Sequence, residues 1–464
     1  MLEHQLEPAR PTLTRSLGTW GVLFLTLSVA TPASSVFVIV PGMFQIAGTG
    51  AVWAMLLAGV VCVATALIYA ELSSAWPAAG GEYVAVARTL GPSAGFVMLG
   101  VNMFNNLLFP PVAGLGVAAV LGAVVPGLPP VPVAVGVVFA AALVAVLRVR
   151  VNAWLTGVFL AVELVALLAV AALGLGGAER PILDFLTAPV MPIGDGLAPA
   201  SPTAIGLAAS IAIFAFNGYG AAVYFGEEML DAPRRIARAI LAALVLTLLF
   251  EGLPTIAALA GAADLHTLLT ADDPFGLIAR QLGGDGFAGV LAIAVVVAIV
   301  NAIIASVLAG ARFFYATGRD GAWGRPVDPW LASVHPRLGS PWAATLLVGA
   351  VGIACCFLPL SFLLVLSGSG LVAIYAGIAL AAIAGRRTGA TAHAPYRMPL
   401  YPLAPIVTLL ALAFVVWTSW ADLEEGRPAL IATAAQIAAA ALYYRWVVRR
   451  RGGWSIHPGL EPSG

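Results

Sequence analysis

The 464-residue chain contains no lysine, and only 9% of its residues are charged. Soluble globular domains carry about 25% charged residues, so this composition excludes a soluble protein. Apolar residues make up 61% of the chain instead. We therefore predict a membrane protein.

Cysteine and histidine are scarce too, with three and five residues. The cysteines lie in apolar stretches, where a free cysteine packs as a small hydrophobic side chain; they are Cys62, Cys355 and Cys356. The histidines are scattered without the spacing of metal ligands. We expect no disulfide framework and no metal site, and neither a cofactor nor a nucleic-acid partner. No nucleophile, base and orienting group can be assembled from the apolar stretches, so we do not expect an enzyme.

Long apolar stretches recur along the chain from Leu17 onward. A helix needs roughly 20 apolar residues to cross about 30 Å of hydrocarbon. The polar start, MLEHQLEPARPTLTR, leads straight into a full-length stretch, so we expect no cleavable signal peptide. We predict twelve transmembrane helices, at residues 17–47, 51–75, 93–124, 131–147, 152–175, 203–226, 237–261, 285–312, 341–358, 361–385, 402–420 and 428–447.

The distribution of the arginines indicates how the twelve predicted helices are oriented in the membrane. With twelve helices, Arg180, Arg280 and Arg427 face one side of the membrane and the other 19 of the 22 basic residues face the opposite side. The positive-inside rule then places both termini in the cytoplasm. A chain rich in Ala and Gly that uses arginine alone is typical of a bacterium with a GC-rich genome. We therefore expect a bacterial inner membrane.

The first ten helices divide into two groups of five, and each group opens with an interrupted helix. The interruptions are Thr31-Pro32-Ala33-Ser34-Ser35 and Asn217-Gly218-Tyr219-Gly220. Because five is odd, the second group starts from the opposite side, which makes an inverted repeat. We predict an all-α membrane protein with twelve transmembrane helices, a five-plus-five inverted repeat with broken helices 1 and 6, and two extra helices. The segments are the N-terminal tail 1–16, the repeats 17–175 and 203–385, helices 11 and 12 at 402–447, and the C-terminal tail 448–464.

Such interruptions are costly in hydrocarbon. Pro32 removes a backbone donor, and Gly218 and Gly220 each weaken a helix by about 1 kcal/mol relative to alanine. Freed peptide groups cost several kcal/mol each unless protein, water or a ligand satisfies them. Paired breaks in matching positions point to the binding site of a transporter. Half-helix ends suit a solute with both a carboxylate and an ammonium group, and a simple kink is the alternative.

Several segments resemble the amino acid, polyamine and organocation (APC) superfamily of transporters. They are YAELSSAWPAAGGEY at 69–83, FAFNGY at 214–219 followed by Glu227-Glu228 and PRRIARAI at 233–240, RFFYATGRDG at 312–321, and Ser340-Pro341. They are spread over most of the chain in the order of the family. The resemblance implies a secondary transporter with five-plus-five inverted repeats that works by alternating access around the two broken helices.

The resemblance also implies substrate contacts. Ala33-Ser34-Ser35 fall where the family often has Gly-Ser-Gly, whose amides hold a substrate carboxylate, but both glycines are absent here. Thr31-Pro32 is more similar to some polyamine importers. Phe214 falls where the family has an aromatic residue that closes over the substrate. The resemblance therefore implies that Phe214 is an outer gate, with ordinary packing as the alternative. The expected substrate contacts are Thr31, Ala33, Ser34, Ser35, Asn105, Phe214, Phe216, Asn217, Gly218 and Tyr219.

Glu163 is an ionisable residue inside a predicted helix, which makes it a functional candidate by default. It lies eleven residues after position 152, or about 16 Å along the helix and close to mid-membrane. In the resemblance it falls where many members have a lysine, so the lysine mechanism of the family cannot operate in this chain. We expect Glu163 to take up the coupling proton. The alternatives are that it neutralises a cationic substrate, or that it hydrogen-bonds a neighbour such as Asn102, Asn105 or Asn106.

Glu251 is the second intramembrane carboxyl. It precedes Gly252 and Pro254 toward the outer part of helix 237–261, where we expect solvent to reach it. A structural or gate role follows from that position.

Charged residues at the cytoplasmic ends of the helices suggest an inner gate of ion pairs. The principal gate residues are Glu71, Glu228 and Arg319. The wider set is Glu227, Asp320, Arg88, Arg234, Arg235 and Arg312. Surface pairs are worth about 0–1 kcal/mol each, which suits a gate that must open. Solvated helix ends are the alternative.

The function expected from these features is secondary active import of a small amine-bearing solute, foremost an amino acid, coupled to protons. Sodium is the alternative ion, held by oxygen groups of Asn301, Ser306, Ser34 and Ser35. The other candidates are a polyamine or organic-amine carrier, a gradient-independent exchanger and, less favoured, a passive channel. The expected partners are therefore the solute, a proton or sodium, and the lipid bilayer.

Overall fold

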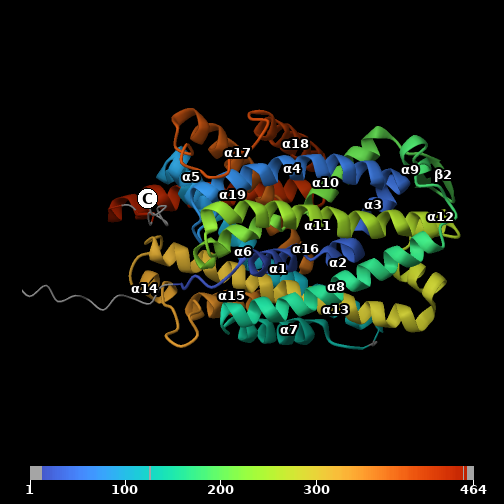
Figure 1. Ribbon diagram of the computed structural model, residues 1–464, viewed down its shortest axis with the longest axis horizontal. Helices are drawn as coiled ribbons and strands as arrows, with labels where there is room; N and C mark the ends of the chain where they lie inside the picture. The colour runs from blue at the N-terminus through green and yellow to red at the C-terminus, as the bar shows by residue number, and fades with distance from the viewer. Residues whose placement is uncertain (1–12, 125–126, 453, 457–464) are drawn as a thin grey trace, which may run out of the picture.

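The computed structural model describes residues 13–124, 127–452 and 454–456. Most of the chain forms helices that run along the long axis of the molecule (Figure 1). Residues 1–12, 453 and 457–464 of the two predicted tails lie outside the described residues.

The first half of the chain contains α1 (Thr19–Ala30), α2 (Pro32–Ser34), the π-helix η1 (Ser35–Ile39), α3 (Val40–Ala47), η2 (Gly48–Gly50), α4 (Ala51–Ala75), α5 (Glu82–Leu90), α6 (Pro92–Val124), α7 (Pro130–Ala145), α8 (Val149–Gly176), α9 (Asp184–Thr187), β1 (Val190–Ile193) and β2 (Gly196–Pro199). The second half contains α10 (Pro202–Ala215), the 3-10 helix η3 (Tyr219–Glu228), α11 (Ala232–Gly261), α12 (Leu265–Thr270), α13 (Pro274–Arg319), α14 (Val327–Leu331), α15 (Trp342–Cys355), α16 (Leu360–Gly368), α17 (Gly370–Thr388), α18 (Leu403–Ala421), α19 (Gly426–Tyr443), η4 (Tyr444–Val448) and η5 (Arg449–Arg451).

The lengths of these helices fit a multi-pass membrane protein. In the described part of the chain, nine helical runs are long and apolar enough to cross a membrane, and α7 and α15 are shorter apolar helices. The first run, Thr19–Ala75, covers predicted helix 17–47 from Thr19 onward and all of predicted helix 51–75, and the two meet at η2. The chain is therefore an all-α membrane protein. The count of twelve and the inverted repeat stay predictions.

Two stretches expected to be loops carry short elements. Residues 176–202 contain α9 and the antiparallel hairpin of β1 and β2, in which Val190 pairs with Pro199 and Ile193 with Gly196. Residues 262–284 contain α12 and the first turns of α13, which bends at Gly284, where φ is 78°. These elements lie at one end of the bundle, and α5, α14 and the C-terminal end lie at the other (Figure 1).

The break in the first helix is present. α1 ends at Ala30, and Thr31 adopts a φ of 42°, in the left-handed region that β-branched residues avoid. Pro32 follows without an N–H and begins α2, after which the helical run continues through η1 and α3 to Ala47. A single residue therefore separates the two halves.

The break in the second helix is present but shorter than expected. α10 ends at Ala215, and Gly218 has a φ of 118°, which glycine adopts readily because it has no Cβ. The 3-10 helix η3 then begins at Tyr219 and runs for ten residues, long for this type of helix. Gly220 thus belongs to η3 and not to the break.

The two breaks touch each other in the interior. A Cβ on Gly218 would stand 2.4 Å from the Cα of Ala30 and 2.7 Å from its nitrogen. The Ser35 hydroxyl donates a hydrogen bond to the carbonyl of Ala215, with 2.9 Å between the oxygens. Around the breaks, α11 packs against α4 and α8, and α13 packs against α6 and α8. The freed peptide groups therefore face protein and not lipid.

Candidate substrate site

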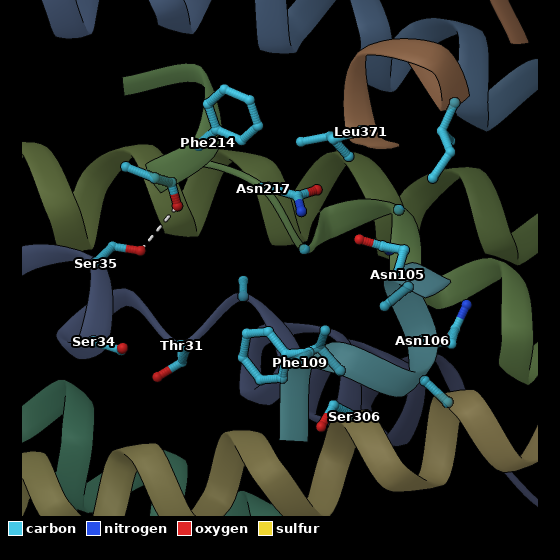
Figure 2. Close-up of a pocket in the computed structure, with 18 of the residues that line it drawn as sticks. Thr31, Ser34, Ser35, Asn105, Asn106, Phe109, Phe214, Asn217, Ser306 and Leu371 are labelled. Atoms are coloured by element: carbon cyan, nitrogen blue, oxygen red, sulfur yellow. Dashed lines mark hydrogen bonds between the residues drawn. The ribbon is translucent and has the colours of Figure 1, made fainter. Parts of the chain in front are cut away.

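A cavity of about 170 Å³ lies between the two breaks. Figure 2 shows Thr31, Ser34 and Phe109 on one side, and Phe214 and Asn217 on the opposite side. Seven of the ten predicted substrate contacts line this cavity, namely Thr31, Ser34, Ser35, Asn105, Phe214, Asn217 and Gly218.

The other three predicted contacts lie behind the wall of the cavity. Ala33, Phe216 and Tyr219 are exposed by 2%, 1% and 0%, and none of them is among the lining residues. Ala33 lies in α2, Phe216 in the turn that follows α10, and Tyr219 at the start of η3, and each packs into the protein interior. Tyr219 instead packs edge-on against Tyr69, with ring centroids 6.1 Å apart.

Glu82 is the residue that the sequence analysis missed. It is the only charged side chain among the described residues that line the cavity. Its carboxylate accepts hydrogen bonds from the Tyr69 hydroxyl at 2.9 Å and the Asn102 amide at 2.8 Å. Burial raises the pKa of Glu82, and these hydrogen bonds oppose that rise. In the sequence, Glu82 follows Gly80-Gly81 at the start of α5, and it drew attention only as part of a segment that resembles the family.

Phe214 separates two cavities. It lines the central cavity and also a second one, of about 470 Å³, that extends to Asp422 and Glu425 between α18 and α19. The Phe214 ring is half-buried. Behind it, the Tyr375 hydroxyl donates to the side-chain oxygen of Asn217 at 2.9 Å, which holds the second break in place.

Glu163 lies against the first break. It is fully buried, and its Oε1 accepts a hydrogen bond from the backbone N–H of Ala33 at 2.8 Å. Its Oε2 has no hydrogen-bond partner among the described residues. The expected alternative partners are engaged elsewhere, since Asn102 donates to Glu82 and Asn106 donates to the carbonyl of Asn102 at 2.9 Å. The carboxylate therefore caps an amide that the break in the helix sets free.

Glu251 is not in contact with solvent, contrary to the expectation from its place in the sequence. Its exposed fraction is 0%, because α11 packs on α4, α8 and α1 over this part of its length. Neither carboxyl oxygen has a hydrogen-bond partner in the described part of the chain.

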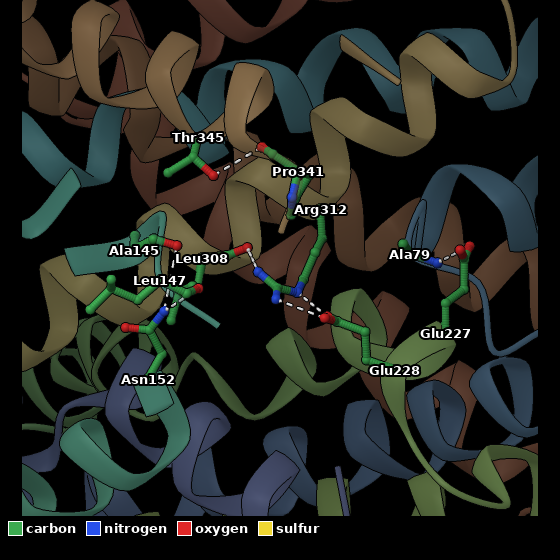
Figure 3. A network of polar contacts seen from close by, with 10 residues as sticks. All are labelled: Ala79, Ala145, Leu147, Asn152, Glu227, Glu228, Leu308, Arg312, Pro341 and Thr345. Carbon is green, nitrogen blue, oxygen red and sulfur yellow. Dashed lines mark hydrogen bonds and ion pairs between the residues drawn. The ribbon is translucent and has the colours of Figure 1, made fainter. Parts of the chain in front are cut away.

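The ion pairs at the α5 end are more buried than expected. Arg312 forms a two-pronged pair with Glu228 and also donates to the carbonyl of Leu308 (Figure 3). Both side chains of this pair are 1% exposed. Removing one partner of such a pair costs about 3–5 kcal/mol, since the other charge stays buried. The expectation of weak surface pairs is therefore wrong for Glu228.

The other gate residues form three further ion pairs. Arg319 contacts Glu227 at 2.6 Å and Asp320 at 3.1 Å, and Glu227 also accepts from the Ala79 N–H at 2.9 Å. Glu71 pairs with Arg386, a residue outside the expected set, through contacts of 2.6 and 2.7 Å. The Glu71 carboxylate also accepts from the Met398 N–H at 2.8 Å. These contacts tie α4 to α17, and η3 to α13.

Three of the four residues expected to hold sodium, Ser34, Ser35 and Ser306, line the cavity, whereas Asn301 does not. Ser306 lines the cavity and donates to the carbonyl of Ile303, whereas Asn301 lies outside the cavity lining and donates to the Ser28 hydroxyl at 2.9 Å. Within the described residues, no group of three or more His, Cys, Asp or Glu side chains is arranged to hold a metal ion.

Comparison with known proteins agrees with this architecture. The amino acid permease family matches residues 17–441. An uncharacterized transporter of Mycobacterium tuberculosis is 32% identical over 341 residues, which cover 73% of each chain. The methylthioribose transporter of Bacillus subtilis is 26% identical over 88% of this chain and 91% of its own. The branched-chain amino acid permease of the same organism is 24% identical, over 87% and 88%. The chain, with a cavity between two broken helices, belongs to the amino acid permease family.

Proposed function

We propose that this chain imports a small amino acid by alternating access and couples the import to protons. The observation that carries the proposal is the cavity between the two breaks, whose wall combines peptide groups freed by both breaks with the Glu82 carboxyl. In this proposal Phe214 is the outer gate, and the pairs of Glu71, Glu228 and Arg319 close the cytoplasmic end. The protein resides in a bacterial inner membrane with both termini in the cytoplasm.

The size and charge of the cavity favour an amino acid over a long polyamine. Its volume of 170 Å³ lies below the range of about 300–1,000 Å³ typical of drug-sized ligands. The ammonium group of the solute is expected near Glu82. The carboxylate is expected at the start of the helical run 32–47, because free N–H groups and the helix dipole favour an anion there.

Proton coupling follows from the contact of Glu163 with Ala33. A hydrogen bond to an ionised carboxylate is roughly twice as strong as one to a neutral group. Protonation of Glu163 therefore loosens its hold on the Ala33 N–H, and with it the position of the half-helix that lines the cavity. The movement of that half-helix between outward and inward states is then linked to proton uptake.

A solute without a carboxylate is the second candidate. Glu163 already accepts the Ala33 N–H, so one of the amides that the resemblance assigns to a substrate carboxylate is occupied. An organic amine, or a neutral thiosugar like the one named for the Bacillus subtilis transporter, would need no such amide. A gradient-independent exchanger uses the same cavity and differs only in its coupling.

A matched set of ligands tests the solute class on the purified full-length protein. L-Leucine carries both charged groups, 3-methylbutylamine lacks the carboxylate, 4-methylpentanoate lacks the ammonium group, and methylthioribose lacks both. A ligand at 100 times its Kd raises the free energy of unfolding by about 2.7 kcal/mol. We expect L-leucine to raise the unfolding temperature most. Equal stabilisation by 3-methylbutylamine would instead favour the amine carrier, and stabilisation by methylthioribose alone would favour the thiosugar.

Uptake into proteoliposomes tests the coupling. Symport predicts that the lumen acidifies as radiolabelled L-leucine enters, and that uptake is saturable. An exchanger would take up leucine only into vesicles preloaded with it. A steady ion current at constant voltage without leucine would contradict a carrier and favour a channel.

A further inference from the structure

Glu251 is a buried carboxyl to which the proposed mechanism assigns no role. It lies within α11, it is 0% exposed, and neither of its oxygens has a hydrogen-bond partner in the described part of the chain. An ionised carboxylate that is removed from water without a counter-charge is very costly. Some species that neutralises the carboxylate is therefore required at this position.

Among the described residues, no arginine or histidine forms an ion pair with Glu251. The helices packed around α11 bring other ionisable groups instead, namely the Glu163 carboxyl of α8 and the Cys62 thiol of α4, together with the Ser35 hydroxyl of η1. On α13, which also contacts α11, Arg312 pairs with Glu228. The arginine of α11 itself that is nearest in sequence is Arg238, which precedes Glu251 by 13 residues, or about 20 Å along the helix.

Glu251 and Glu163 lie near the same break from two different helices. Glu163 of α8 accepts a hydrogen bond from Ala33, and α11, which carries Glu251, packs against both α2 and η1, the segments that follow the break. Within the described ranges, buried oxygen atoms of Glu163, Thr31 and Tyr219 also lack hydrogen-bond partners. A negative charge on one carboxyl disfavours ionisation of a second carboxyl near the same break, so we expect the two protons to leave in separate steps.

We propose that Glu163 and Glu251 form a two-carboxyl proton site around the first break, and that each transport cycle carries two protons with the solute. Each carboxylate takes one proton, forms one O–H bond on the outward side and releases the proton on the inward side, with no redox change. The two-proton cycle rests on the proposed proton-coupled import. The presence of the two-carboxyl site does not depend on that proposal.

Infrared spectroscopy of the purified protein tests the paired site without any solute. A pH-difference spectrum reports the C=O stretch of carboxylic acids that gain or lose a proton. We expect Glu251→Gln to remove one such band, Glu163→Gln to remove another, and each variant to shift the band that remains. An unchanged spectrum in Glu251→Gln would overturn the proposal. If that variant does not fold, Glu251→Leu provides an apolar replacement of the kind that is often tolerated at buried charges.

Thr247→Val is the matched control. Thr247 lies one turn before Glu251 on α11, it is also 0% exposed, and its hydroxyl also lacks a partner in the described residues. It cannot titrate in this range, so the variant should retain every carboxyl band. Loss of a band in Thr247→Val would show that the spectrum reports packing of α11 rather than Glu251, which would overturn the assignment.

The reversal potential of leucine flux in proteoliposomes counts the protons. With a tenfold gradient of L-leucine, the reversal potential is about 59 mV for one coupled charge and about 30 mV for two. We expect the lower value for the wild type and the higher value for Glu251→Gln. The one-charge value in the wild type would overturn the two-proton cycle. Uptake that requires external sodium, and loses this requirement in Glu251→Gln, would overturn the proton assignment.

The two proposals fail in distinguishable ways. Absence of leucine flux in the wild type contradicts the proposed import, while the infrared bands still decide whether Glu251 and Glu163 are a pair. Normal proton-coupled flux with an unchanged Glu251→Gln spectrum contradicts the pair alone.

Discussion

Gly218 packs directly on Ala30, so the second break of the bundle lies against the last residue before the first break. The contact leaves no room for a side chain, since a Cβ on Gly218 would meet the Ala30 Cα at 2.4 Å. The positive φ of Gly218 adds a second restriction, because residues with a Cβ adopt this conformation at a cost. The two breaks therefore depend on each other for their geometry.

Gly218→Ala is expected to destabilise the protein and to abolish uptake. Overpacking costs about 1–3 kcal/mol, and the left-handed conformation costs about 1–2 kcal/mol more. Thermal unfolding in detergent, together with uptake, measures both effects. Gly252→Ala is the control, since its Cβ would have no neighbour within 4 Å in the described structure. Equal stability of the two variants would contradict the close contact.

Glu163→Gln is expected to remove the pH dependence of transport while solute binding stays measurable. The amide oxygen of glutamine still accepts the Ala33 N–H but takes up no proton in this range. Initial rates of uptake between pH 5 and 8, about the range in which a tuned carboxyl titrates, test this. Glu163→Leu is the companion variant, and it leaves the Ala33 N–H unpaired at a cost of about 1–3 kcal/mol. Persistent pH dependence in Glu163→Gln would show that the coupling proton binds elsewhere.

Glu228→Gln is expected to lower the free energy of unfolding by about 3–5 kcal/mol, because the Arg312 guanidinium stays buried without its counter-charge. Replacing both residues, with Glu228→Leu and Arg312→Met, should recover most of the loss. The exposed pair of Arg235 and Asp231, at 3.8 Å, is the matched control. Asp231→Ala should cost less than about 1 kcal/mol. If Glu228→Gln also lowered the free energy of unfolding by less than about 1 kcal/mol, the buried pair would be dispensable.

Glu82→Gln is expected to change how stability depends on pH. Burial raises the pKa of Glu82 in the folded protein, so between the unfolded and folded pKa values the folded protein binds more protons than the unfolded chain. The contribution of Glu82 to stability is therefore complete below about pH 4 and falls as the pH rises through the folded pKa. Chemical unfolding of wild type and variant over a pH series should show the variant gaining relative stability as the pH rises. A constant difference would contradict the shifted pKa.

The same Glu82→Gln variant is expected to weaken binding of L-leucine, because the cavity loses the carboxylate proposed to meet the ammonium group. Binding of 4-methylpentanoate, which has no ammonium group, should change little. Equal weakening of both ligands would place the effect in the packing of the cavity wall around Tyr69 and Asn102.

Short-range features of this protein were predictable from the chain alone. The two breaks depend on residues that act within their own turn, since Pro32 lacks a donor and Gly218 permits a positive φ. The membrane class follows from composition, which needs no tertiary information. Seven of the ten expected substrate contacts line the cavity; five of them lie at the breaks, Asn105 lies on another helix, and Phe214 was expected from the family resemblance.

Pairings between distant segments were not predictable. Glu71 pairs with Arg386, 315 residues further along the chain. Nothing near Glu71 in the sequence indicates that Arg386 is its partner. Glu82, at the start of α5, is held at the cavity by hydrogen bonds from Tyr69 of α4 and Asn102 of α6.

The sequence by itself therefore determined that this is a membrane protein and where its helices break. The apolar length of a segment and the chemistry of proline and glycine are local properties. Tertiary structure alone decided that Glu251 is sealed from water and that Glu163 caps Ala33. Burial and pairing depend on which helices pack together. In an apolar chain every helix has a similar surface, so the sequence does not indicate which helices become neighbours.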